Sequence, residues 1–149
     1  MTLTDIDLGY LAGIIDGEGT ISVMYRQSRT GRSPGLSCRV SVGNTNADLL
    51  SWLANTCGGK VYTGTVRMAN AKPYSTWVLL GQPAVDLVAQ IEPHLKIKRQ
   101  QAILTAEIAA LLLPRTGSNR LRVVSDDLRE KREALVAEFR RLNSKGVAS

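Results

Sequence analysis

The segment 9–19, GYLAGIIDGEG, constrains the fold more than any other part of the chain. Its run of apolar residues predicts a helix, in which positions four residues apart lie on the same side. Three such positions are glycines: Gly9, Gly13 and Gly17. Glycine inside a helix costs roughly 1 kcal/mol relative to alanine. We therefore expect a second backbone to pack closely against this stripe, with the carboxylates of Asp16 and Glu18 at the foot of the helix.

Length and composition favour one compact domain over residues 1–149. With 149 residues, 44% of them hydrophobic, the chain is long enough to bury a core. No apolar stretch reaches the roughly 20 residues of a membrane span, and no signal peptide opens the chain. We expect an intracellular protein, in the cytoplasm or nucleoid of a bacterium or an organelle matrix, with no membrane partner and no small-molecule cofactor. Cys38 and Cys57 lack metal-ligand spacing and are predicted to be reduced core residues, a disulfide being the less favoured alternative.

Positive charge is concentrated between residues 21 and 80. This segment holds seven Lys and Arg residues and one acid, Asp48, whereas the remainder holds twelve of each sign, so the net charge of +6 arises in this segment. Such concentration is typical of a surface that binds phosphates. The alternative is a solvated basic face that only keeps the protein soluble.

The same segment predicts four strands that share one apolar and one polar face. Apolar residues alternate along 21–26 and 37–42, and a hairpin within 60–80 directs Trp77 and Leu79 inward. In that hairpin we expect Thr63 on the polar side and Tyr62 on the other. A polar face without acids can bind phosphates and base edges. The side chains predicted to contact DNA, on this face or in the turns beside it, are Ser22, Met24, Arg26, Ser28, Arg29, Arg32, Ser37, Arg39, Ser41, Thr63, Thr65, Arg67, Lys72, Tyr74 and Thr76.

Helices account for the rest of the chain. A short helix, capped by Asn46 and ended by Gly58-Gly59, is predicted between the two strand pairs. Beyond the sheet, Pro83 suits the first turn of a third helix, and a longer helix is predicted over 96–113. After it we expect a basic loop (114–124), a helix that starts at Ser125 and ends near residue 143, and a loose tail (144–149).

The residues from Leu11 to Gly19, LAGIIDGEG, resemble the signature of the LAGLIDADG homing endonucleases. Five letters of the name match directly, namely Leu11, Ala12, Gly13, Asp16 and Gly19, whereas Gly17 replaces alanine and Glu18 replaces aspartate. The resemblance covers residues 5 to about 113. It implies an α/β (α+β) fold of the αββαββα type, with a saddle-shaped antiparallel four-stranded DNA-binding sheet and additional C-terminal helices.

The sequence contains one copy of this motif, so one chain supplies one Glu18. Cutting both strands of a duplex needs metal at two scissile phosphates, and each divalent ion takes several oxygen ligands. Two-fold dimers are also the commonest oligomers. We therefore expect a homodimer packed through the motif helices, with Gly9, Ala12, Gly13 and Asp16 at the interface.

The resemblance also implies the catalytic residues. Glu18 and the backbone carbonyl of Gly17 would hold Mg²⁺, or another divalent cation such as Mn²⁺, which activates water. Lys98 stands where single-motif members keep a basic residue near the scissile phosphate, with Lys96 as the alternative, and Asn44 stands where a polar residue orients water. Each has a structural alternative: lysines in the first turn of a helix, and an asparagine in a strand-end turn or helix cap.

One position departs from the family pattern. Asp48 stands where well-known single-motif members carry a basic side chain, so Arg39 or Lys72 would have to contribute there. His94, the only histidine, is assigned a structural role because no second base or ligand lies near it in sequence.

The implied function is a site-specific double-strand DNA endonuclease, encoded within an intron or a similar mobile element, with a long pseudo-palindromic target. Two alternatives stay open: an RNA maturase, and a DNA-binding regulator that does not cut. Glu18 disfavours the regulator, because a carboxylate facing phosphates weakens a pure binder.

Overall fold

The structure, a computed structural model, describes residues 2–26, 35–64, 69, 73–111 and 126–144. Its elements follow the order α1 (Asp5–Glu18), β1 (Gly19–Arg26), β2 (Gly35–Asn44), α2 (Ala47–Cys57), β3 (Lys60–Thr63), β4 (Ser75–Leu80), α3 (Gln82–Ile91), the 3-10 turn η1 (Glu92–His94), α4 (Arg99–Leu111) and α5 (Asp126–Asn143). The predicted αββαββα order is confirmed, with two further helices after α3. None of the described helices is long and apolar enough to span a membrane.

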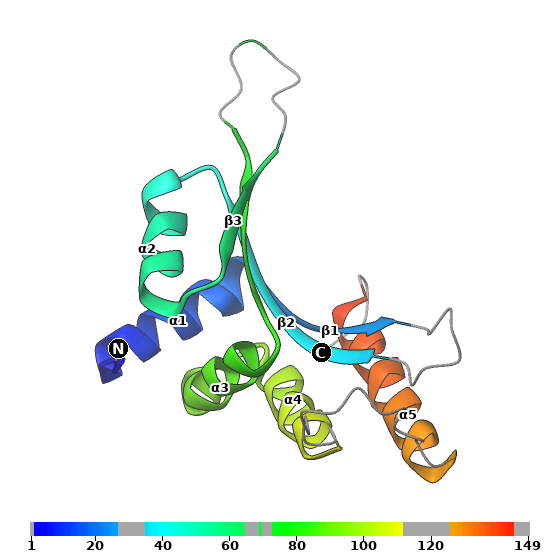
Figure 1. Ribbon diagram of the computed structural model, residues 1–149. Coiled ribbons are helices and arrows are strands. Elements are labelled where there is room, and N and C mark those ends of the chain that lie inside the picture. Colours follow the sequence, from blue (N-terminus) through cyan, green and yellow to red (C-terminus); the bar gives the residue numbers. More distant parts are fainter. Residues whose placement is uncertain (1, 27–34, 65–68, 70–72, 112–125, 145–149) are drawn as a thin grey trace, which may run out of the picture.

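The four strands form one antiparallel sheet in the order β1-β2-β4-β3. The sheet is strongly curved, and α1, α2, α3 and α4 gather on one side of it (Figure 1). Helix α5 packs against α4 and β1. The register aligns Ile21 with Val40 and Val40 with Leu79, so alternate residues of all the strands share the side that the helices cover.

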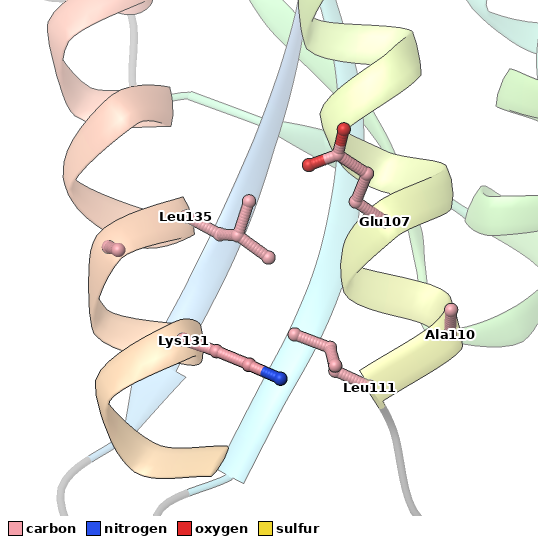
Figure 2. A pocket seen from close by; sticks show the side chains of 6 residues that line it. Glu107, Ala110, Leu111, Lys131 and Leu135 are labelled. Atoms are coloured by element: carbon pink, nitrogen blue, oxygen red, sulfur yellow. The ribbon is translucent and has the colours of Figure 1, made fainter. Parts of the chain in front are cut away.

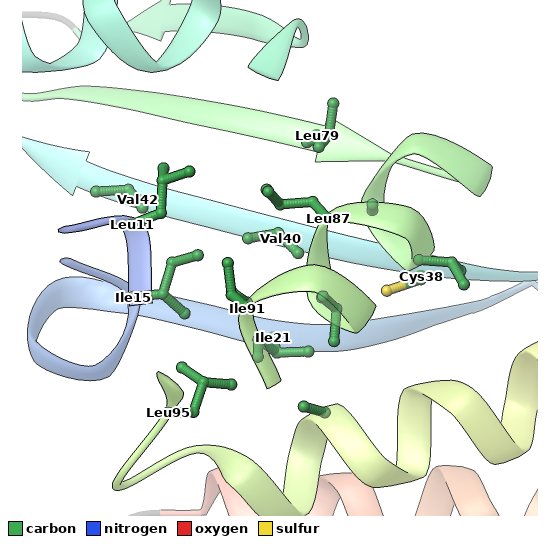
Figure 3. Packing of buried hydrophobic residues seen from close by; sticks show 14 of the residues in the cluster. Leu11, Ile15, Ile21, Cys38, Val40, Val42, Leu79, Leu87, Ile91 and Leu95 are labelled. Atoms are coloured by element: carbon green, nitrogen blue, oxygen red, sulfur yellow. The ribbon is translucent and has the colours of Figure 1, made fainter. Parts of the chain in front are cut away.

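The core lies between this covered side and the helices. Trp77 is fully buried and Leu79 is nearly so, as the alternation predicted. Side chains of α1, α3 and the sheet point toward one another, among them Leu11, Ile15 and Ile91 (Figure 3). Cys38 and Cys57 are free thiols, and burial raises the pKa of each to about 11. Both are therefore neutral at physiological pH, in keeping with the predicted packing role.

Local signals fix most helix ends. Thr4 and Asp7 form a capping box that begins α1, and the side chain of Asn46 accepts the Leu49 N–H at 3.0 Å to begin α2. Helix α2 ends where Gly58 and Gly59 adopt φ angles of 79° and 86°, which favour glycine. The expected positions of Asn46, Gly58-Gly59 and Pro83 are confirmed.

One helix end differs from the prediction. Helix α4 begins at Arg99 rather than residue 96, and residues 96–98 form a turn ahead of it whose backbone N–H groups bond to Asp16. Residues 112–125, which include the basic loop and Ser125, lie outside the described part. At the other end of α5, Asn143 donates to the carbonyl of Ile21 at 2.9 Å and so ties the helix to the outer edge of β1.

Candidate active site and nucleic-acid interface

The side of the sheet opposite the helices, called the open face below, carries mainly polar side chains, neutral or basic. The register puts Ser22, Arg39 and Leu80 in one row across β1, β2 and β4, and Gly43, Thr76 and Tyr62 in another across β2, β4 and β3. The four described strands contain no Asp or Glu. The described residues on this face are Thr20, Ser22, Met24, Ser37, Arg39, Ser41, Gly43, Lys60, Tyr62, Thr76, Val78 and Leu80.

Most predicted DNA contacts that can be placed lie on the open face. Ser22, Met24, Ser37, Arg39, Ser41 and Thr76 all do so by register. Tyr74, just ahead of β4, is exposed and lies over Gly43, because a Cβ on Gly43 would overlap the tyrosine hydroxyl. Gly43 is thus needed for the close approach of this ring.

The predicted face of Thr63 is wrong. It aligns with Ser75, one residue away from the Val61–Trp77 pair, and so lies on the covered side of the sheet. Its hydroxyl accepts a hydrogen bond from Ser75 at 3.2 Å. Tyr62 takes the open face instead and is 56% exposed. The error arose because all four residues of β3 are exposed, so hydrophobicity did not reveal the direction of their side chains.

Several predicted contacts fall outside the description. The backbone of Arg26 belongs to β1, but its side chain is not described. Nothing is described for the remaining predicted contacts: Ser28, Arg29, Arg32, Thr65, Arg67 and Lys72.

Glu18 lies where α1 passes directly into β1, and its side chain is exposed. Asn44, at the end of β2, donates its Nδ2 to Glu18 Oε2 at 2.5 Å. The Oδ1 of the same amide accepts the N–H of Asn46 at 2.8 Å, which fixes the orientation of the amide. Asn46 in turn caps α2. A chain of hydrogen bonds therefore runs from the start of α2 to the Glu18 carboxylate, and the predicted pair of Asn44 and Glu18 is in contact.

Asp16 and Lys98 form a second group at the same end of α1. The Asp16 carboxylate accepts the backbone N–H groups of Lys96, Ile97 and Lys98 at 2.7, 3.2 and 2.9 Å. Burial opposes ionisation of Asp16, but these N–H groups and the Lys98 ammonium together lower its pKa. The Lys98 Nζ donates to the Asp16 carbonyl at 2.6 Å. Burial lowers the pKa of Lys98, and the Asp16 charge opposes that change.

The two candidate lysines differ in their surroundings. Lys98 is half-buried against the end of α1, whereas Lys96 is exposed. Neither lies in the first turn of a helix, since both precede α4. His94 is exposed in η1. Asp48 occupies the first turn of α2, where the helix dipole favours an acid.

Two of the predicted interface residues are occupied within the chain itself. Ala12 is 1% exposed and packs in the core, so it is not available to a second copy, and the Asp16 carboxylate bonds to the backbone of residues 96–98. Ala12 was assigned to the interface together with Gly13, but adjacent residues of a helix point to different sides. Gly9, Gly13 and Gly17 are exposed, and a Cβ on any of them would meet nothing within 4 Å. Ile6, on the same side of α1, is 84% exposed.

A metal ion at Glu18 would need donors beyond the side chains of one chain. Among the described residues, no three His, Cys, Asp or Glu side chains are placed to hold a cation together. The Gly17 carbonyl is available in principle, because carbonyls in the last turn of a helix have no partner within the helix. An exposed carboxylate and a carbonyl are oxygen donors of the kind that Mg²⁺ prefers, so the donor set fits part of a magnesium site.

An open pocket of about 460 Å³ lies between α4 and α5, beside the part where the two helices pack (Figure 2). Glu107 and Leu111 line it from α4, and Lys131 and Leu135 line it from α5. None of its lining residues is among the predicted site residues, and it takes no part in the site described above.

No model of a protein family matches the sequence. No curated protein matches it. Solved structures do match, and they define the class of the fold, which is that of the LAGLIDADG homing endonucleases. The likeness rests on structure, because the sequence identities below are low.

The homing endonuclease I-CvuI, in complex with its target in the presence of Ca, has a TM-score of 0.71 and 21% identity, over 97% of this chain and 86% of that one. The archaeal intron-encoded endonuclease I-Vdi141I, complexed with DNA, has a TM-score of 0.71 and 19% identity, over 97% and 89% of the two chains. The LAGLIDADG homing endonuclease I-SmaMI, bound to cleaved DNA, has a TM-score of 0.68 and 12% identity, over 99% of this chain and 48% of that one.

Proposed function

We propose that this protein is a site-specific DNA endonuclease that cuts both strands and acts as a homodimer. The observation that carries the proposal is the exposed Glu18 carboxylate at the junction of α1 and β1, beside an open face without acids. A protein that only bound nucleic acid would gain nothing from a carboxylate there. Neighbours of the fold were solved on DNA, including one on cleaved DNA.

The open face supports DNA binding. Arg39 lies at its centre, between Ser22 and Leu80, and can donate to a base edge or a phosphate. The hydroxyl groups of Ser22, Ser37 and Ser41 lie beside it, and the exposed Tyr62 and Tyr74 extend the face toward β3. A curved antiparallel sheet of this kind can follow the major groove of a duplex.

The groups at the end of α1 support hydrolysis. Glu18 and the Gly17 carbonyl would hold the divalent cation, with DNA phosphate and the partner's equivalent groups as further oxygen donors. When bound, the cation activates water and stabilises charge on the phosphate. Asn44 orients the Glu18 carboxylate, and the Lys98 ammonium supplies positive charge near the scissile phosphate.

The bare side of α1 supports a dimer. Ile6 and the three stripe glycines (Gly9, Gly13 and Gly17) form an exposed strip with room for a second backbone. A two-fold axis along this strip would place two Glu18 side chains near each other, one for each DNA strand. The chain spans about half the length of I-SmaMI, as expected for a subunit that supplies one half of a two-site enzyme.

The proposal is tested by first finding the target. Duplexes that bind the protein are selected from a random library in EDTA, and the selected sequences are then incubated with protein and Mg²⁺. We expect a pseudo-palindromic consensus and breaks in both strands. Selected duplexes that bind tightly but stay intact would support the regulator instead, and preferential binding of structured RNA would support the maturase.

A further inference from the structure

We propose that Asp16 is the positioning residue that holds Lys98 beside Glu18. This inference rests on the proposed function, in which Lys98 lies near the scissile phosphate. Asp16 and Lys98 are 82 positions apart in the sequence, yet hydrogen bonds join the end of α1 to the turn ahead of α4.

The Asp16 carboxylate organises that turn. Its Oδ2 accepts the N–H of Lys96 at 2.7 Å, and its Oδ1 accepts the N–H groups of Ile97 and Lys98 at 3.2 and 2.9 Å. Three consecutive N–H groups can converge on one small anion only when the chain folds around it. The carboxylate therefore sets the path of residues 96–98, although Ile97 itself is 72% exposed and has no core packing to hold it.

The backbone of Asp16 takes the second role. Its carbonyl accepts the Lys98 Nζ at 2.6 Å. Carbonyls in the last turn of a helix lack a helical partner and lie at the negative end of the helix dipole, so a lysine ammonium is stabilised there. The ammonium is thus docked two residues before Glu18. The same residue fixes both ends of Lys98, its backbone through the carboxylate and its ammonium through the carbonyl.

Substitution of Asp16 separates these roles. Asp16→Ala removes all three carboxylate contacts but keeps the carbonyl. Asp16→Asn keeps one acceptor oxygen and places an NH₂ group against N–H donors, so it weakens the turn and preserves the side-chain volume. In both variants we expect residues 96–98 to leave the end of α1 and to carry Lys98 away from Glu18.

The first test probes the surroundings of Lys98 by chemical labelling and does not depend on DNA cleavage. The folded protein is acylated with N-hydroxysuccinimidyl acetate, and each lysine is followed by mass spectrometry. In the parent, Lys98 should react more slowly than the exposed Lys96, and in Asp16→Ala the two rates should converge. An unchanged ratio in Asp16→Ala overturns the proposal.

The second test measures the rate at which each variant cleaves the selected DNA target. Asp16→Ala should slow cleavage roughly 10²-fold at unchanged DNA affinity, as displacement of a catalytic group by about 1 Å can do. The double variant Asp16→Ala/Lys98→Ala should be no slower than Lys98→Ala alone, because Asp16 acts through Lys98. Additive losses would overturn the positioning role. Asp16→Asn, with a smaller effect in the same direction, replaces Asp16→Ala should that variant not fold.

Asp7→Asn is the matched control. It alters an acid of the same helix and weakens the capping box at Thr4, far from the turn, so stability should fall while cleavage and Lys98 labelling stay at the parental values. A parent that binds but never cuts would contradict the proposed function. The labelling ratio would still decide by itself whether Asp16 holds Lys98.

Discussion

The two faces of the sheet use alternate residues of the same four strands, yet one face is buried in the core and the other is open. On the covered face, Val40, Val42 and Trp77 are fully buried, and their identity is fixed by volume and hydrophobicity. On the open face, Arg39, Ser41 and Thr76 are sequence neighbours of these residues and contribute little to the core. The difference teaches that stability and recognition can be changed separately in one strand, one residue apart.

The largest expected effect is on the covered face. Trp77→Ala should lower the free energy of unfolding by about 3–5 kcal/mol, because it opens a cavity and removes the hydrogen bond from the indole to the Gly58 carbonyl. Chemical denaturation measures this. Leu80→Ala, on the open face of the same strand, should cost at most about 0.5 kcal/mol. Equal losses of unfolding free energy at Trp77 and Leu80 would contradict this difference between the two faces.

The second-largest expected effect is on dimer formation through the exposed glycine side of α1. A Cβ added at Gly13 meets no atom of the chain within 4 Å, and leucine improves helix propensity, so the Gly13→Leu monomer should be at least as stable as the parent. The dimer should weaken roughly 10- to 100-fold in dissociation constant, because the new side chain separates the helices. Sedimentation equilibrium measures the assembly. A variant that dimerises like the parent would contradict the proposed interface.

On the open face, Arg39→Ala should weaken binding to the selected DNA by about 1–3 kcal/mol and leave the unfolding free energy near the parental value. The salt dependence of binding sharpens the assignment: a phosphate contact lowers the slope by about 1, and a base contact relaxes specificity at one position. Arg140→Ala, which removes the same charge from the exposed side of α5, is the control.

The smallest effect is in the pH dependence of stability. Asp16 has a lowered pKa in the folded chain, so its contribution is present above its ordinary value of 3.8 and is lost as the pH falls through the folded value. Asp16→Asn should therefore flatten the loss of thermal stability below about pH 4. Melting curves between pH 5 and pH 3 measure it, and parallel curves for parent and variant would contradict the role of the ionised carboxylate.

The covered face was predictable, because apolar alternation identifies buried strand residues such as Val40 and Trp77. The ends of α2 were predictable too, because residues such as Asn46 and Gly58-Gly59 mark a helix end by their own type. Long-range hydrogen bonds were not. Nothing local indicates that Asp16 bonds to residues 96–98 or that Asn143 bonds to Ile21, because such contacts depend on how distant elements pack. The face of Thr63 was predicted wrongly, because the pairing of a short edge strand with its neighbour decides which way its side chains point.

The central claim is that Glu18 cuts DNA. Glu18→Gln keeps the size of the side chain and its contact with Asn44 but removes the negative charge that would hold the cation. On the selected target with Mg²⁺, we predict a loss of double-strand cleavage of at least about 10³-fold, with DNA affinity equal to or tighter than that of the parent. Cleavage by Glu18→Gln at the parental rate would contradict the account.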